Sequence, residues 1–501
     1  LRMSRGLGDV YKRQESGMLS YVGRVNYSYD DKYLFEFMLR SDASAKFAPQ
    51  NYWGMFPSWS AGWVISDEKW FDKDKTKIDF LKIRGSFGIL GKDNVNAWLW
   101  TQLYTRNPDK GPIFGTNSST NTSATIRMPK QGVNPDVHWD KTYKTNFGID
   151  MAFLKNRMSA NLDFYYDMGR EMFASHQGTS YYPNTVGIQP APENFGEVDT
   201  YGVELSLGWK DKIGKDMSYW VKLTTGYNDN KIRETGWKAA YDFDKLVRNE
   251  RSDRGLWGYE CIGMFRSYQE INEYFDKYSI TKYLGNTKEN VHPGMLIYKD
   301  VRGQYDESTG TFGPADGIVD EQDYIKISHR ASNPYGGTLN FGFSYKDFSI
   351  SAQFGASWGA YSLVPTTMRK ESYSEYSNVS AMWKDMFVYE DIYDANNIVT
   401  VAQNRNAKYP NIRYSSVNGA PSTFWKVSAA TVQLRNMTVA YALPKEWLKI
   451  IGISSCRFNL TCQNVFNFLN PYPEGAWASW AGSYGYYPNL RKFTLGVNVS
   501  F

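Results

Sequence analysis

The 501-residue sequence is poor in cysteine and histidine, and it contains no long apolar run. Its three cysteines, Cys261, Cys456 and Cys462, form neither a disulfide framework nor a zinc-binding pattern. A membrane-spanning helix needs a run of about 18 apolar residues, and none occurs. The net charge of +5 is small for this length. Because the basic residues also form no cluster, the sequence predicts no nucleic-acid partner.

Aromatic residues are abundant, although the chain as a whole is polar. The sequence has 38 Tyr, 28 Phe and 17 Trp, which together make 17% of the residues. The mean hydropathy is nevertheless −0.54. This combination is typical of a membrane β-barrel, because only alternate strand residues face lipid and Tyr and Trp gather at the membrane interfaces.

Strict two-residue alternation runs through the chain. The last residues, KFTLGVNVSF, place an apolar side chain at every second position and end on Phe501. The segments 20–29, 33–42, 147–153, 158–166, 200–209, 339–345, 348–354 and 457–463 alternate in the same way. A soluble sandwich or a membrane barrel would show this pattern. Charged and amide side chains on the polar phase favour a hydrated lumen, and we predict that it is lined by Arg24, Glu36, Arg40, Arg157, Asp163, Glu204 and Arg457.

Short and long connections alternate along the chain, as they do between the periplasmic turns and outer loops of outer-membrane barrels. We count about 13 strands, and in TVQLRNMTVAYALP a phase slip predicts a bulge near Arg435 and Asn436. An odd number of strands cannot close an even-stranded barrel, so we predict that the chain is part of a larger barrel. Residues 1–14 resemble translated sequencing-adapter sequence, which leaves 15–501 as the predicted fold.

Several ordered segments resemble the SusC/RagA-type TonB-linked outer-membrane transporters. They include SYVGRVNYSYDDKYLFEFMLRSDASAKF, WGMFPSWSAGWVIS, LKIRGSFGILGKDNV, NAKYPNIRYS, FWKVSAATVQLRNMTVAYALP, FNLTCQNVFNFLNPYPE and RKFTLGVNVSF. The resemblance implies an all-β, transmembrane, antiparallel up-and-down barrel of about 22 strands, of which this chain holds about 13. It also implies that the first strands, a plug and an N-terminal extension are missing.

The resemblance further implies a location in the bacterial outer membrane and no enzymatic activity. The expected function is TonB-dependent import of oligosaccharides or peptides with a SusD-like surface lipoprotein, and TonB would act through the missing N-terminal region. A passive porin and a barrel-embedded hydrolase are the alternatives. The hydrolase rests on GASWG at 355–359, which fits a nucleophile-elbow pattern around Ser357. No helical pattern follows it, and the four histidines His138, His176, His292 and His329 fall in predicted loops.

Two loop features are candidate binding sites. The stretch 300–323 resembles a calcium-binding loop of the family, with Asp300, Asp316, Asp320, Asp323 and the Ile318 carbonyl as candidate ligands. Arg302 and the insertion of residues 303–315 depart from that pattern and favour a solvated acidic loop. No other cofactor is expected. Loop aromatics that would stack on substrate or pack on a partner are Trp98, Trp100, Tyr181, Tyr182, Trp477, Trp480 and Tyr484.

Overall fold

The computed structural model describes residues 17–107, 125–127, 132–174, 185, 188–236, 248–306, 308–370, 380–450, 452–469, 472 and 490–501. Residues 1–14, which we predicted to be foreign to the fold, lie outside these ranges. The chain divides into two compact units. Unit 1 comprises Leu1–Leu205, Asn228–Lys238 and Leu246–Ser252, and unit 2 comprises Ser206–Tyr227, Ala239–Lys245 and Asp253–Phe501.

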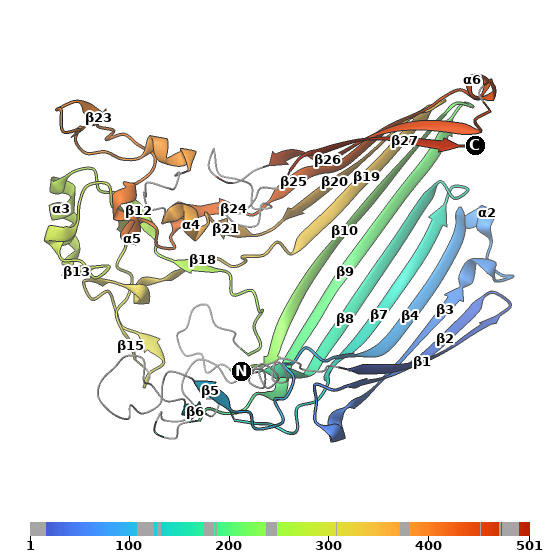
Figure 1. Cartoon of the computed structure of the whole chain (residues 1–501), viewed down its shortest axis with the longest axis horizontal. Coiled ribbons are helices and arrows are strands. Elements are labelled where there is room, and N and C mark those ends of the chain that lie inside the picture. The colour runs from blue at the N-terminus through green and yellow to red at the C-terminus, as the bar shows by residue number, and fades with distance from the viewer. Residues whose placement is uncertain are drawn as a thin grey trace, which may run out of the picture. The chain divides into compact units, whose positions relative to one another are not determined.

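Thirteen long strands form one antiparallel sheet, in the order β1-β2-β3-β4-β7-β8-β9-β10-β19-β20-β25-β26-β27 (Figure 1). Their bounds are β1 Met18–Tyr29, β2 Tyr33–Ser44, β3 Trp53–Val64, β4 Ile78–Lys92, β7 Asp140–Phe153, β8 Met158–Ala174, β9 Glu193–Ile213, β10 Met217–Glu234, β19 Tyr335–Tyr345, β20 Phe348–Trp358, β25 Thr431–Ala442, β26 Ser455–Leu469 and β27 Lys492–Ser500. The predicted all-β, up-and-down architecture and the number of strands are confirmed.

The connections carry short elements. The strands among them are β5 Thr105–Asn107, β6 Thr125–Arg127, β11 Leu256–Gly258, β12 Cys261–Met264, β13 Lys282–Tyr283, β14 Leu296–Tyr298, β15 Tyr305–Asp306, β16 Thr311–Phe312, β17 Ile318–Val319, β18 Ile325–Ser328, β21 Tyr361–Leu363, β22 Ile392–Tyr393, β23 Val399–Val401 and β24 Lys426–Ser428. The α-helices are α2 Lys73–Thr76, α3 Tyr268–Tyr278, α4 Thr366–Arg369, α5 Ser415–Asn418 and α6 Lys445–Lys449. In the described part of the chain, none of the helices combines the length and the apolar character needed to cross a membrane.

The β1–β2 hairpin shows how the sequence sets the register of unit 1. Asp30 and Asp31 both have positive φ, at 53° and 52°, which is the backbone of a tight turn that matches the twist of the strands. Lys32 reaches back to the Asp30 carboxylate at 2.6 Å. Tyr29 then pairs with Tyr33, and the register continues without a shift to Met18 and Ser44. The two alternating segments 20–29 and 33–42 are confirmed as strands.

A small aromatic core closes one end of the unit 1 strands. Trp139 is 5% exposed, and its ring centroid lies 5.3 Å from those of Phe47 and Phe56. Its indole N–H donates to the Tyr52 carbonyl at 2.9 Å. The core therefore joins residues from the β2–β3 connection, β3 and the segment before β7.

In unit 2 the predicted bulge lies at Arg435. Gln353 pairs with Asn436 whereas its neighbour Phe354 pairs with Leu434, so Arg435 is an extra residue on β25. The shift continues into β26, where Asn436 pairs with Gln463 but Leu434 pairs with Phe466. A bulge of this kind changes the phase of the alternation, which is the signal that the sequence carries.

Two hydrophobic clusters make the loops of unit 2 compact. The first gathers Phe265, Tyr283, Leu296, Tyr298, Val319 and Phe387, all fully buried, and the second centres on Trp425. Asn418, which is 0% exposed, connects distant parts of the first cluster. Its amide group donates to the Gly294 and Asn411 carbonyls, and its oxygen accepts from the Leu296 N–H at 2.8 Å. These loops are thus a folded layer with their own buried polar network.

The Asn418 network predicts a local instability. Replacing Asn418 by Leu keeps the volume but leaves the buried Leu296 N–H without its acceptor and removes one of two donors from each of the Gly294 and Asn411 carbonyls. We therefore expect the loop core to lose about 1–3 kcal/mol. Hydrogen exchange at β12 and β14 measures this loss. The control Asn396→Leu alters an exposed turn residue and should leave that exchange unchanged. Equal protection in both variants would contradict the proposed role of Asn418.

Candidate functional site

The candidate site is the polar face of the unit 1 sheet. The register places Arg24, Glu36, Arg40 and Asp163 on one face, since their cross-strand partners fall on a single phase from β1 to β8. Arg24 contacts Glu36 at 2.6 Å. Arg40 donates from Nε to both carboxylate oxygens of Asp42, at 2.9 and 2.7 Å. Whether this face borders a lumen stays a prediction.

Arg84 is the centre of this face. Its guanidinium contacts the Asp150 carboxylate at 3.1 Å and the Asp163 carboxylate at 2.7 Å. Asn161 donates to the second Asp150 oxygen at 2.8 Å. Glycine at 148 makes room for the guanidinium, because a Cβ built there would lie 2.5 Å from the Arg84 Cζ. The network links β4, β7 and β8 through side chains on the polar phase.

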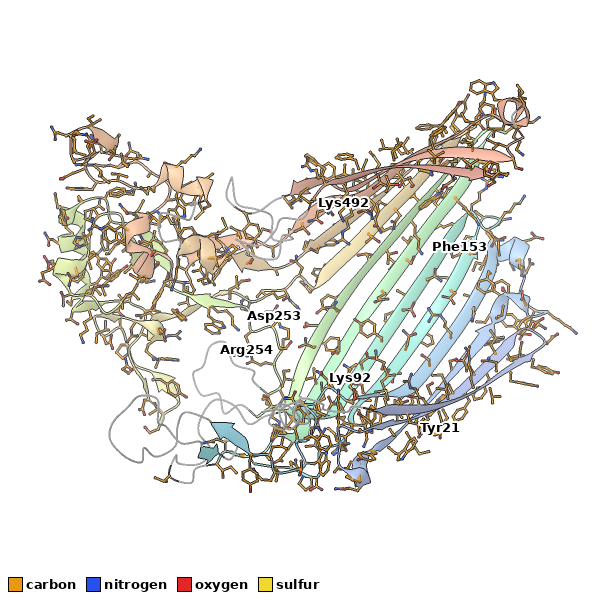
Figure 2. The ribbon with its side chains drawn as sticks, in the orientation of Figure 1. Tyr21, Lys92, Phe153, Asp253, Arg254 and Lys492 are labelled. Atoms are coloured by element: carbon orange, nitrogen blue, oxygen red, sulfur yellow. The ribbon has the colours of Figure 1, made fainter. Side chains whose placement is uncertain are left out.

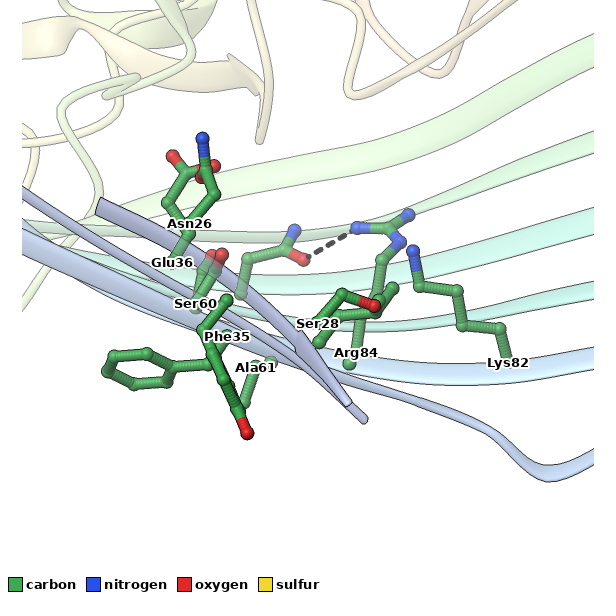
Figure 3. Close-up of a pocket in the computed structure, with 14 residues that line it drawn as sticks. Asn26, Ser28, Phe35, Glu36, Ser60, Ala61, Lys82 and Arg84 are labelled. Carbon is green, nitrogen blue, oxygen red and sulfur yellow. Dashed lines mark hydrogen bonds between the residues drawn. The ribbon is translucent and has the colours of Figure 1, made fainter. Parts of the chain in front are cut away.

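Two hollows lie along the same face. The first has a volume of about 540 Å³, and its polar lining includes Asn26, Glu36, Ser60, Lys82 and Arg84 (Figure 3). The second, of about 510 Å³, is lined by Arg40, Asp42, Lys46, Lys92, Asp93 and Trp139 among others. Both hollows carry charges of both signs, so they suit polar ligands rather than lipid.

The opposite face is aromatic and exposed. Phe35 is 47% exposed, Trp59 44% and Phe147 45%, although each lies within a long regular strand. Tyr21, one of the labelled residues in Figure 2, stacks on Trp53 with ring centroids 5.9 Å apart. A contiguous apolar surface of this kind is unfavourable in water and favourable against hydrocarbon.

The other predicted lumen residues are more scattered. Glu204 is exposed in β9. Arg457 lies in β26 and donates to the Ser349 hydroxyl at 2.9 Å. Arg157 is the last residue of the turn between β7 and β8, and Leu154, Lys155 and Asn156 before it all have positive φ. Its place at a lumen stays a prediction.

Of the predicted substrate-binding aromatics, the structure describes Trp98 and Trp100. Their ring centroids lie 5.7 Å apart at an angle of 38°, and Leu99 between them packs against the Trp139 core. Trp98 has a φ of 70°, which is unusual for a bulky residue. The other five residues, Tyr181, Tyr182, Trp477, Trp480 and Tyr484, lie outside the described residues.

The acidic stretch 300–323 folds around its carboxylates. Asp323 is fully buried and accepts from the backbone N–H groups of Val301, Arg302 and Asp320. Asp300 accepts from the Gly317 N–H at 2.7 Å. Asp316 and Asp320 accept from the N–H groups of Ile318 and Gln322. Among the residues that the structure describes, no three acidic, His or Cys side chains are placed to hold a metal ion. The calcium site stays a prediction.

Arg302 takes a structural position in this loop. Its Nε donates to the Gln322 carbonyl at 2.6 Å, Nη2 donates to the Tyr324 carbonyl, and the guanidinium lies over the Phe312 ring at 4.2 Å. Burial lowers the pKa of Arg302 and raises the pKa of both Asp300 and Asp323. Backbone N–H donors oppose the rise at the two carboxyls.

Ser357 lacks the setting of a nucleophile. It is a strand residue of β20, and its hydroxyl lies 3.1 Å from the Asn333 amide nitrogen and 3.0 Å from the Thr431 hydroxyl. The chain continues from β20 into β21, whereas a nucleophile elbow leads into a helix. GASWG is therefore part of the sheet and its hydrogen-bonded edge.

Comparison with known proteins supports this description. No family model matches the chain. The chain is similar to TonB-dependent receptor P39 of Formosa agariphila, with 24% identity over 96% of the chain and 46% of the relative. It is 26% identical to TonB-dependent receptor SusC of Bacteroides thetaiotaomicron, over 97% of the chain and 44% of that protein. The RagAB peptide transporter structure matches 97% of the chain and 48% of its own chain, with a TM-score of 0.68 and 19% identity.

The antiparallel sheet, with one aromatic face and one charged face, is the fold of the outer-membrane TonB-dependent receptors to which the chain is similar. Within that class the chain is similar to SusC, and its fold matches that of the RagAB transporter. It spans about half the length of the curated relatives that it matches. These curated relatives are receptors, and the matching solved structure is that of a transporter.

Sequence reasoning missed the centre of the polar network. Arg84 and Asp150 lie on the polar phase of β4 and β7, and that phase was the available signal. Their distance along the chain, 66 residues, hides the contact until the register of both strands is known.

The network predicts unequal effects of two charge removals. Arg84→Met leaves Asp150 and Asp163 without their shared cation, so we expect a loss of about 1–3 kcal/mol, moderated by partial solvation. The control Lys144→Met removes a more exposed cation that contacts only Asp167, at 2.7 Å. Urea unfolding of the membrane-inserted receptor measures both variants. Equal losses would contradict a central role for Arg84.

The acidic loop predicts a pH dependence. A carboxyl whose pKa is higher in the folded chain binds its proton more tightly there, so its contribution to stability falls as pH rises through the raised pKa. We therefore expect the Val301 and Gly317 amides to be better protected from exchange near pH 4 than near pH 7, after correction for intrinsic rates. Asp323→Asn should weaken this dependence. A rise in protection with pH on adding calcium would instead favour the metal site.

Proposed function

We propose that this chain forms barrel wall and outer loops of an importer that takes oligosaccharides or peptides across the outer membrane. TonB supplies the energy, and a SusD-like surface lipoprotein delivers the substrate at the outer loops. The proposal rests on one observation above others. The similarity to SusC covers 97% of the chain, so it includes the long connections as well as the strands.

The compact loops of unit 2 support a role in binding. The loop clusters bury Phe265, Leu296, Tyr298 and Trp425 almost completely. The Asn418 amide donates to the Gly294 and Asn411 carbonyls. The buried Arg369 donates from Nε to the Val364 carbonyl at 2.7 Å. A rigid layer of this kind presents a fixed surface to a substrate or partner, at a lower entropic cost than a loose loop would.

The polar face of unit 1 supports passage of a hydrated ligand. Its two hollows combine cations, carboxylates and hydroxyls, as the surroundings of Arg84 and Arg40 show. RagAB, whose fold the chain shares, is a peptide transporter. The proposal therefore includes both oligosaccharides and peptides as substrate classes.

The uptake experiment tests the proposal. Cells carrying a deletion of the receptor gene, and cells lacking TonB, receive fluorescent oligosaccharides and peptides. We expect intracellular accumulation to fall at least about tenfold in both strains, because import against a gradient needs the energised complex. Uptake that depends on the receptor but not on TonB would contradict import and favour the passive porin.

A Ser357→Ala receptor is the matched control for catalysis. The substitution removes the hydroxyl that contacts Asn333 and Thr431 but leaves the strand pairing intact. We expect uptake to persist in this variant. A receptor-dependent hydrolysis of membrane lipid that disappears with Ser357 would contradict the proposal in favour of the hydrolase.

A further inference from the structure

The polar face of unit 2 carries a continuous row of side chains that crosses six strands. In register order it consists of Lys222, Asn340, Gln353, Asn436, Gln463 and Lys492. We call this set the amide row. Each member is directly opposite the next on the neighbouring strand, from β10 through β19, β20, β25 and β26 to β27 (Figure 1; Lys492 is labelled in Figure 2).

The amide row is long, polar and accessible. Neighbouring strands lie about 4.8 Å apart, so six positions span roughly 24 Å. The Asn436 amide donates to the Gln353 oxygen at 3.0 Å, which fixes the middle of the row. None of the six side chains is buried. An Asn or Gln side chain that does not make all of its hydrogen bonds within the protein can offer both a donor and an acceptor to a ligand.

The bulge adds a cation beside the row. Arg435 lies across Gly355, because a Cβ built on that glycine would meet the guanidinium at 2.3 Å. Any larger residue at 355 would displace it. The next row along the strands carries Thr438, Thr461 and Thr494, of which the first two hydroxyls lie 3.3 Å apart. Hydroxyls therefore flank the row on the other side.

Negative charge is absent from five of the six strands that carry the row, and the acidic residues of the sixth strand, β10, are Asp229 and Glu234 near its end. Strands β19, β20, β25, β26 and β27 contain neither Asp nor Glu. Within the described part of the chain, no carboxylate forms an ion pair with Lys222, Arg435 or Lys492. The polar face of unit 1 differs, since Glu36, Asp150 and Asp163 neutralise its arginines. Lys222 and Lys492 of the amide row, and Arg435 beside it, are thus available to an anionic ligand.

We propose that the amide row binds an extended acidic oligosaccharide, one whose sugars carry carboxylate or sulfate groups. This inference rests on the proposed function and narrows its substrate class. Asn and Gln side chains pair with sugar hydroxyls through donors and acceptors together. Lys222, Arg435 and Lys492 form charge-assisted hydrogen bonds with the acidic groups. A peptide would present fewer hydroxyls, and its extended backbone would meet no free strand edge at the middle of this sheet.

The test compares three probes on the intact receptor in outer-membrane vesicles. They are an oligogalacturonate, a neutral malto-oligosaccharide of equal length and an oligoglutamate peptide. We expect the oligogalacturonate to bind at least about tenfold more tightly than either of the others. Equal affinity for the neutral sugar would overturn the acidic preference. Equal affinity for oligoglutamate would overturn the assignment to a sugar.

Variants then locate the site. We expect two variants, Arg435→Gln and the double variant Lys222→Gln/Lys492→Gln, each to bind oligogalacturonate about tenfold more weakly. Their affinity for the malto-oligosaccharide should change less than about twofold. Lys212→Gln, which removes a cation at the end of β9, is the matched control and should bind as the unchanged receptor does. A resistance to SDS unfolding equal to that of the unchanged receptor verifies that each variant is folded. Unchanged oligogalacturonate affinity in the folded variants would overturn the proposal.

The outcome is separable from that of the broader function. If TonB-dependent uptake of any oligosaccharide or peptide is absent, the importer proposal itself is wrong. If such uptake is present but the binding affinity depends neither on the charge of the ligand nor on the substitutions in the row, only the amide-row inference is wrong.

Discussion

The register of the long antiparallel sheet is the constraint on which the remaining features depend. Side chains alternate between faces with a period of two, so a slip of one residue would exchange the faces of a whole strand. Arg84 would then lie among the rings of Trp59 and Phe147, and Asp150 would lose its cation. The tight turn at Asp30 and Asp31 opposes such a slip between β1 and β2, and the ion pairs of Arg84 oppose it between β4, β7 and β8.

Local signals were sufficient for the strands. Alternation located β1, β2, β7, β8, β19, β20, β26 and β27, and the phase slip located the bulge at Arg435. Their boundaries were less accurate. β9 extends from Glu193 to Ile213, well beyond the alternating part, because pairing with its neighbours continues where the pattern of residues no longer shows two faces.

The loops and the candidate sites were harder to predict because their contacts join distant parts of the chain. Asn418 contacts Leu296 across 122 residues, and no local pattern announces the buried amide. Trp98 and Trp100 were predicted to stack on substrate or pack on a partner, and the sequence did not indicate that Leu99 between them packs on the aromatic core of unit 1. The amide row was equally hidden. Its residues look like ordinary polar positions of six separate strands, and only the pairing register aligns them.

The bulge also sets how strand lengths can change. Between the paired positions around Gln353 and Phe354, β20 advances by one residue, β25 by two and β26 by three. The number of residues between these paired positions therefore increases by one from each strand to the next. A single-residue deletion in β25 would break this progression unless β26 were shortened as well. Insertions and deletions in these two strands are thus expected to occur as matched pairs during divergence of the family.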